Sequence, residues 1–112
     1  MGKLKVVFHV DEMAKWSLTL INVRNLLRDT KQEVEVIVIA NSEAVEGFKP
    51  NYELAHVMTK QNGNGIVFEA CANALKAHDL GKDTILDFVQ IIPNSITELI
   101  NRQQDGFAYI KP

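Results

Sequence analysis

The sequence predicts an α/β fold in which five mainly parallel strands form one sheet with helices on both faces. Two observations carry this prediction. Short apolar runs alternate with helical patterns along the whole chain, and residues 34–40 (VEVIVIA) are almost continuously apolar. Alternation at this spacing is typical of parallel sheets, and such a run suits a central strand that is covered on both faces. The length of 112 residues fits a single domain over residues 1–112.

Five short runs are expected to be the strands of this sheet. Each is apolar, contains β-branched or aromatic residues, and is bounded by polar or turn-forming residues. The expected strands lie at residues 4–9, 34–40, 66–70, 88–92 and 107–110.

Four helices are expected between these strands. Residues 12–28 carry apolar side chains at spacings of three and four, which predicts a helix with one buried face. Shorter helices are expected at residues 51–60 and 72–77, and a fourth from Ser95. Residues 43–50 contain a glycine and a proline, so we expect a loop there.

Capping residues mark several of these helix ends. Asp11 and Asn51 are expected to be N-caps. Residues 95–98 (SITE) match a capping box, in which Ser95 would be the N-cap and Glu98 would bind back to it. Gly106 suits the position that follows the end of the fourth helix.

Composition and charge exclude several classes of function. The net charge is −2, and Lys and Arg are scattered, so nucleic-acid binding is not expected. No apolar run reaches the roughly 18 residues of a membrane span. A single cysteine excludes an internal disulfide and suits a reducing compartment. We therefore expect a soluble, cytoplasmic protein.

Polar side chains follow the expected strands at their carboxyl ends, where open parallel sheets bind ligands. These residues are His9, Asp11, Asn41, Ser42, Glu69, Cys71, Asn94 and Ser95. We expect one cleft, formed by Cys71 together with His9, Asn41, Glu69 and Asn94. Asn73 is a further candidate for this pocket.

Cys71 is the central candidate because it lies where a helix begins. Helix amides and the helix dipole stabilise a thiolate there, whereas Glu69 would oppose it if its carboxylate faces the sulfur. The alternative is that Cys71 is a small buried hydrophobe. His9 is either a base or hydrogen-bond partner for the thiol, or a strand-end histidine bonded to backbone. The dispersed histidines lack the spacing of metal ligands, and no dinucleotide fingerprint is present, so neither a metal nor a cofactor is expected.

Three segments together resemble the DsrE/DsrF-like family: residues 5–10 (KVVFHV), 69–75 (EACANAL) and 104–112 (QDGFAYIKP). The resemblance covers essentially the whole chain. It implies a three-layer α/β/α domain with a five-stranded, mainly parallel sheet (DsrEFH-like), often assembled as trimers or hexamers. In the sulfur-relay branch, a cysteine at the position matching Cys71 carries a persulfide sulfur between proteins. The basic segment that often follows it there is replaced here by residues 76–79 (KAHD).

Two functions remain in competition. The first is a sulfur carrier in which Cys71 accepts a persulfide sulfur from a donor protein and gives it to an acceptor protein, without independent turnover. The second is a module that binds a small molecule or a protein, with Cys71 as lining of the pocket. A homo-oligomer, a trimer or a pair of trimers, is expected in either case. Besides the resemblance, this expectation rests on four large side chains that a small core is not expected to hold: Trp16, Phe48, Tyr52 and Phe107.

Overall fold

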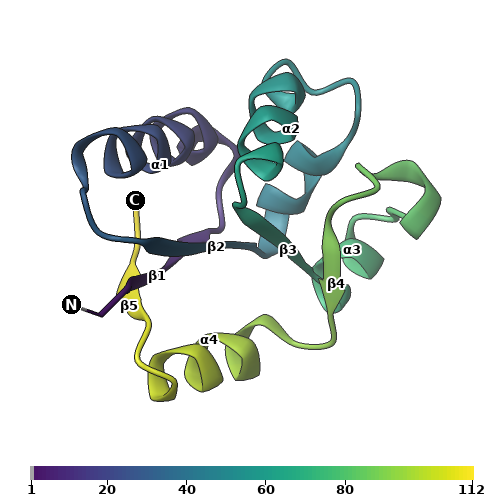
Figure 1. Cartoon of the computed structure of the whole chain (residues 1–112). Coiled ribbons are helices and arrows are strands. Elements are labelled where there is room, and N and C mark those ends of the chain that lie inside the picture. Colours follow the sequence, from purple (N-terminus) through teal and green to yellow (C-terminus); the bar gives the residue numbers. More distant parts are fainter. Residues whose placement is uncertain (1) are drawn as a thin grey trace.

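The computed structural model describes residues 2–112 and shows one five-stranded sheet with helices on both faces (Figure 1). The strand order is β4-β3-β2-β1-β5, and all four pairings are parallel. The predicted α/β fold with a parallel sheet is therefore confirmed. The strands are β1 (Leu4–Val10), β2 (Val34–Ala40), β3 (Val67–Cys71), β4 (Gln90–Ile92) and β5 (Ala108–Ile110).

The helices form a thick layer on one face and a thin layer on the other. In Figure 1, α1 and α2 lie above the sheet and α4 lies below it, while α3 follows β3 at the edge near β4. The α-helices are α1 (Trp16–Asp29), α2 (Ala55–Gly63), α3 (Ala72–Ala77) and α4 (Ser95–Gln104). Short 3₁₀ segments are η1 (Met13–Lys15), η2 (Ser42–Phe48) and η3 (Lys82–Thr84).

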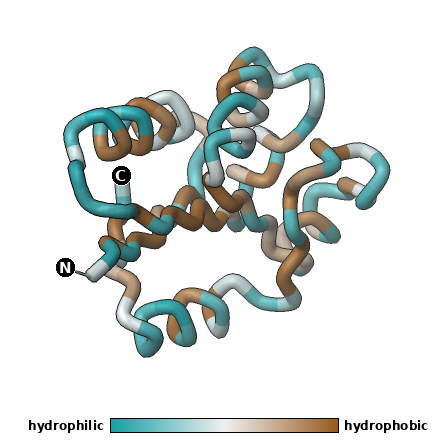
Figure 2. The backbone as a smooth tube through the Cα atoms, viewed as in Figure 1, coloured by the Kyte–Doolittle hydropathy of each residue, from teal (hydrophilic) through white to brown (hydrophobic). Residues whose placement is uncertain are grey.

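Side chains along β1 and β2 point alternately to the two faces of the sheet, so the core has two parts. Phe8 of β1 and Val38 of β2 belong to the larger cluster, which includes residues of α1, α2 and η2. Val7 and Ile37 point to the other face and belong to a smaller cluster that contains Leu99 of α4. Figure 2 shows the apolar residues concentrated along the sheet and on the helix sides that face it. Both faces of the central strands are therefore buried, as a continuous apolar run requires.

Aromatic side chains fill the centre of the larger cluster. Trp16 packs edge-on against Phe48 with 5.3 Å between ring centroids, and its Nε1 donates to the Ala44 carbonyl at 2.9 Å. Trp16 and Phe48 are fully buried, and Phe107 is buried on the other face. The inference that these rings exceed the core of one protomer is therefore wrong. Only Tyr52 of that set is left half-buried.

The first helix begins later than its sequence pattern suggests. Residues 13–15 form the 3₁₀ segment η1, and α1 starts at Trp16. Asp11 caps neither segment, because its carboxylate accepts a hydrogen bond from Lys111 Nζ at 2.9 Å. The second helix also starts later, at Ala55, without a side-chain cap, so Asn51 is not an N-cap.

Other boundaries also differ from expectation. The expected loop at 43–50 contains the 3₁₀ segment η2. Strand β3 is displaced by one residue and includes Cys71. Strand β4 begins only at Gln90, because Phe88 and Val89 pack into the larger cluster before the chain enters the sheet.

The end of α4 is as predicted and directs the chain into β5. Gly106 has a φ of +92°, the left-handed conformation that glycine adopts without steric cost. The Gly106 amide donates to the Gln103 carbonyl at 3.1 Å and the Phe107 amide to the Arg102 carbonyl at 3.0 Å. This pair of bonds is a Schellman motif, and it reverses the chain so that Phe107 enters the smaller cluster.

Candidate functional site

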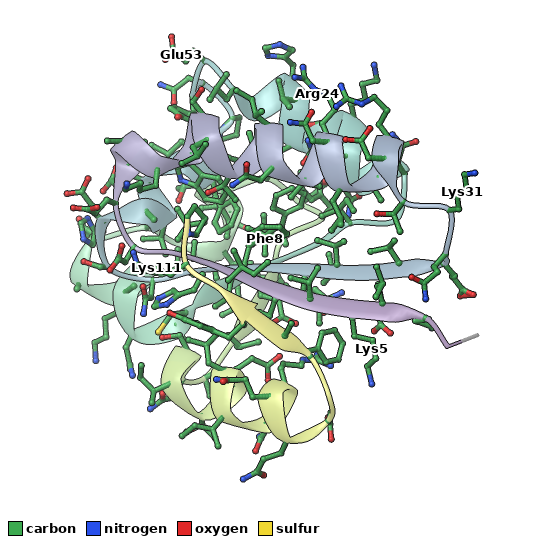
Figure 3. The ribbon with its side chains drawn as sticks, turned by 90° about the vertical axis from the view of Figure 1, so that its left-hand side faces the viewer. Lys5, Phe8, Arg24, Lys31, Glu53 and Lys111 are labelled. Atoms are coloured by element: carbon green, nitrogen blue, oxygen red, sulfur yellow. The ribbon has the colours of Figure 1, made fainter. Side chains whose placement is uncertain are left out.

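Cys71 is the last residue of β3 and directly precedes α3. Its Cα is in register with Ile92, the last residue of β4, so the thiol lies at the carboxyl edge of the sheet. In Figure 3 this edge is the one near Lys111, opposite the end near Lys5. The cysteine is 5% exposed, so its thiol is largely shielded from water.

The start of α4 is organised around Asn94 instead of Ser95. Asn94 Oδ1 accepts hydrogen bonds from the amides of Ile96 at 2.9 Å and Thr97 at 3.2 Å, which makes Asn94 the N-cap. The predicted capping box with Ser95 as N-cap is therefore wrong, and Glu98 binds Arg102 at 3.1 Å. The side-chain oxygen of Asn94 binds the helix amides, whereas the amide and hydroxyl of Ser95 act on Cys71.

Two opposing effects act on the pKa of the Cys71 thiol. Burial raises the pKa, but the donor groups near the sulfur, which are the Ser95 hydroxyl and the amides of Ala74, Ser95 and Asn73, lower it by more, so the net pKa is below the ordinary value. The sulfur makes no capping hydrogen bond of regular geometry to α3. These donors therefore favour the thiolate mainly by electrostatic attraction.

His9, at the carboxyl end of β1, connects two other elements. Its Nδ1 lies 2.6 Å from the Tyr109 hydroxyl on β5, and its Nε2 lies 2.9 Å from Asn41 Oδ1, directly after β2. Asn41 Nδ2 in turn lies 3.1 Å from Ser95 Oγ at the start of α4. A continuous series of hydrogen bonds thus runs from Tyr109 to Ser95, and the Ser95 hydroxyl lowers the pKa of the Cys71 thiol.

Glu69 lies on the same strand as Cys71 but belongs to a different group. Its Oε2 lies 3.4 Å from Arg102 Nη2 on α4, and its buried Oε1 has no hydrogen-bond partner within residues 2–112. Burial and the neighbouring Glu98 raise the pKa of Glu69 to about 8, although Arg102 partly offsets them. Glu69 is therefore mostly neutral at pH 7 and does not repel a thiolate at Cys71.

The expected cleft is only partly reproduced by these positions. His9 and Asn41 contact each other, and Ser95 connects Asn41 to the surroundings of Cys71, while Glu69 lies beside Arg102 of α4 and Asn94 caps that helix. The side chain of Asn73 is exposed on α3, and only its amide acts on the sulfur. A groove of about 310 Å³ opens beside the site; it is lined by Ile92, Pro93, Asn94, Thr97, Glu98 and Asn101.

Sequence reasoning missed two members of this group. Ser95 is expected at the carboxyl edge but not in the cleft, and Tyr109 is not among the expected site residues. The position of Ser95 directly after a helix N-cap could have indicated it. Tyr109 reaches His9 only because β5 pairs with β1, a neighbour relation that the sequence does not show.

Two comparisons with known proteins give matches over most of the chain. The sequence model of the DsrE/DsrF-like family matches residues 4–112. The chain belongs to the DsrE/DsrF-like family. A solved structure described as a protein of unknown function, MTH1491 from Methanobacterium thermoautotrophicum, superposes with a TM-score of 0.91 at 32% sequence identity. The match covers 97% of this chain and 99% of that one. No curated protein matches the chain.

Two other kinds of site are absent from the described part of the chain. Among residues 2–112, no group of three or more His, Cys, Asp or Glu side chains is arranged to hold a metal ion. Over the same range, no helix combines the length and apolar character needed to cross a membrane.

Proposed function

We propose that this protein is a sulfur carrier in which Cys71 accepts and releases a persulfide sulfur. The observation that carries this proposal is the donor-rich environment of the thiol, in which Ser95 and three backbone amides outweigh burial and lower its pKa. Membership of a family that contains sulfur-relay proteins is consistent with it.

The reaction requires a nucleophilic thiolate and no redox change. The Cys71 thiolate attacks the outer sulfur of a donor persulfide, which forms a new S–S bond. The S–S bond of the donor breaks, and the donor's inner sulfur leaves as a thiolate that water can protonate. Cys71 then carries the outer sulfur as a persulfide. Release reverses these steps, with the thiolate of an acceptor as the attacking group.

The composition of the chain is compatible with a carrier. Cys71 is the single cysteine, so a sulfur accepted there cannot be expelled by an internal disulfide. It must leave to another molecule or to the Cys71 of another copy. We therefore propose a donor protein and an acceptor protein as partners, in the cytoplasm, and expect no independent turnover.

We also propose that the protein works as a homo-oligomer, a trimer or a hexamer. Several apolar side chains remain exposed on α4 and on the two edge strands; they are Ile91, Ile96, Ile100, Tyr109 and Ile110. Such surface often marks protein contacts. Light scattering at micromolar concentration should therefore give a multiple of the 12.6 kDa chain mass, and the mass of one chain would contradict the proposal.

A module that binds a small molecule or a protein is the second candidate. The groove of about 310 Å³ beside α4 supports it, because pockets of this volume hold small ligands. In that case Cys71 is part of the hydrophobic core and takes no sulfur.

Mass spectrometry separates the two functions. The protein is incubated with glutathione persulfide, freed from reagent, and its intact mass is measured. A gain of one sulfur atom in the wild type, absent from Cys71→Ser, supports the carrier. An unchanged mass for both proteins would refute it and leave the binding module.

A further inference from the structure

Four side chains from separate parts of the polypeptide form one continuous series of hydrogen bonds at the carboxyl edge of the sheet: Tyr109, His9, Asn41 and Ser95. We propose that this hydrogen-bonded chain is oriented toward Cys71, so that the Ser95 hydroxyl donates to the anionic sulfur that Cys71 carries. The inference deepens the proposed function, because it assigns positioning residues to the thiolate and persulfide of that site.

Asn41 determines which group donates in each of these hydrogen bonds. An amide oxygen only accepts hydrogen bonds and an amide nitrogen only donates them. The oxygen, Oδ1, faces His9 Nε2 at 2.9 Å, so Nε2 must carry a hydrogen. The nitrogen, Nδ2, faces Ser95 Oγ at 3.1 Å, so the serine oxygen accepts this bond.

The donors of the first and last hydrogen bonds in this series follow from the assignment at Asn41. A neutral imidazole with its hydrogen on Nε2 has a lone pair on Nδ1. The Tyr109 hydroxyl, 2.6 Å from that atom, therefore donates to His9. At the other end, the Ser95 hydrogen is not used by Asn41 and is available to the sulfur of Cys71. Each residue thus donates to the next, from Tyr109 to Cys71.

The direction of these hydrogen bonds affects the sulfur because the last donor, the Ser95 hydroxyl, points to a charged acceptor. Hydrogen bonds to an ionised acceptor are stronger than those between neutral groups, and consecutive bonds that point the same way polarise one another. The amides of Ser95, Asn73 and Ala74 add further donors around the sulfur. This arrangement favours an anionic sulfur, the thiolate before loading and the outer sulfur of the persulfide after it.

The first test reads the direction from His9 itself. Imidazole ¹⁵N chemical shifts, measured at about pH 8 where an ordinary histidine is neutral, distinguish the two tautomers. We expect the hydrogen of His9 on Nε2 in the wild type and a loss of that preference in Tyr109→Phe. A hydrogen on Nδ1 in the wild type would mean that the chain runs the opposite way and would overturn the inference.

The second test reads the sulfur. The rate of alkylation by iodoacetamide against pH gives the pKa of the Cys71 thiol. We expect Ser95→Ala to raise that pKa by about one unit, a roughly tenfold loss of thiolate at neutral pH. Ser95→Thr keeps the hydroxyl and should restore most of the effect. An unchanged pKa in a folded Ser95→Ala variant would overturn the inference.

A pair of variants separates direction from charge and does not depend on the fold of the serine variants. Asn41→Asp replaces the amide donor by an acceptor, so the Ser95 hydrogen turns away from the sulfur. Asn94→Asp adds the same charge at the start of α4 but keeps the capping oxygen. We expect Asn41→Asp to raise the thiol pKa more than Asn94→Asp does, and equal shifts would overturn the inference.

These measurements are independent of sulfur loading. The His9 tautomer and the pKa of the Cys71 thiol are measured on protein that has not been treated with persulfide. If both measurements agree with the proposed direction of the hydrogen bonds but persulfide leaves the intact mass unchanged, the proposed direction is supported and the carrier function is refuted. If sulfur is loaded but the tautomer is the opposite one, the function stands and the oriented chain fails.

Discussion

Arg102 Nη2 lies 3.4 Å from Glu69 Oε2, so a guanidinium on α4 reaches a carboxyl group on the underside of β3. The same side chain binds Glu98 through Nε at 3.1 Å. One positive charge therefore faces two carboxyl groups. If Glu69 holds a proton, the group of three is neutral, which explains how Glu69 can be 1% exposed beneath α4.

This arrangement predicts that stability falls as pH rises. Burial and Glu98 raise the folded-state pKa of Glu69 from 4.5 to about 8. Between those values the folded state holds a proton that the unfolded state has released, so the free energy of unfolding decreases with increasing pH. Glu69→Gln keeps the shape and removes the titration. Its melting temperature should exceed that of the wild type increasingly from pH 5 to pH 8.

The control for this prediction is an exposed carboxylate. Glu53 lies on the surface, so Glu53→Gln should follow the wild-type dependence on pH (Figure 3). If Glu69→Gln also runs parallel to the wild type across this range, Glu69 is ionised in the folded protein and the neutral group of three does not exist.

The cap of α4 gives a second prediction. Asn94→Ala removes the acceptor of two backbone amides, and the loss of such a cap costs about 1 kcal/mol. Chemical denaturation should show this decrease. Asn94→Asp retains a capping oxygen and should stay close to the wild type. Equal destabilisation by both variants would show that the amide group itself, and not capping, is what matters at this position.

A third prediction concerns the close approach of η2 to α1. A Cβ on Gly47 would overlap the indole ring of Trp16, which is fully buried and cannot move aside. Gly47→Ala should therefore destabilise the protein by about 1–3 kcal/mol, the usual cost of overpacking a core.

Gly81→Ala is the matched control for Gly47→Ala. A Cβ on Gly81 meets nothing within 4 Å, and its φ of −82° is open to any residue. Denaturation of this variant should give a stability near that of the wild type. Equal stabilities for the two variants would show that η2 can move away from Trp16.

The parts of the fold that the sequence could predict are those with a local cause. The continuous apolar run predicted β2 at its observed bounds, and Gly106 predicted the end of α4. The start of that helix could not be predicted as well, because Asn94 and Ser95 are both good caps and the choice depends on where β4 ends. Asp11 failed as a cap because Lys111, at the far end of the chain, holds its carboxylate.

In the candidate site, too, the sequence predicts some positions and not others. The rule that ligands bind at the carboxyl ends of parallel strands placed His9, Asn41 and Cys71 at one edge, where the structure also has them. The rule cannot say which helix covers which strand. Glu69 was misplaced for that reason, since Arg102 of α4 draws it under the helix. Tyr109 was missed because strand order is not readable from the sequence.

The most direct test of the sulfur-carrier function is to follow a sulfur atom onto and off Cys71. The wild type is loaded with glutathione persulfide, desalted, and then mixed with an excess of a low-molecular-weight thiol, with the intact mass recorded after each step. A carrier gains one sulfur atom in the first step and loses it in the second, while Cys71→Ser changes in neither. No gain in the first step, or a gain that Cys71→Ser shares, would contradict the sulfur-carrier function.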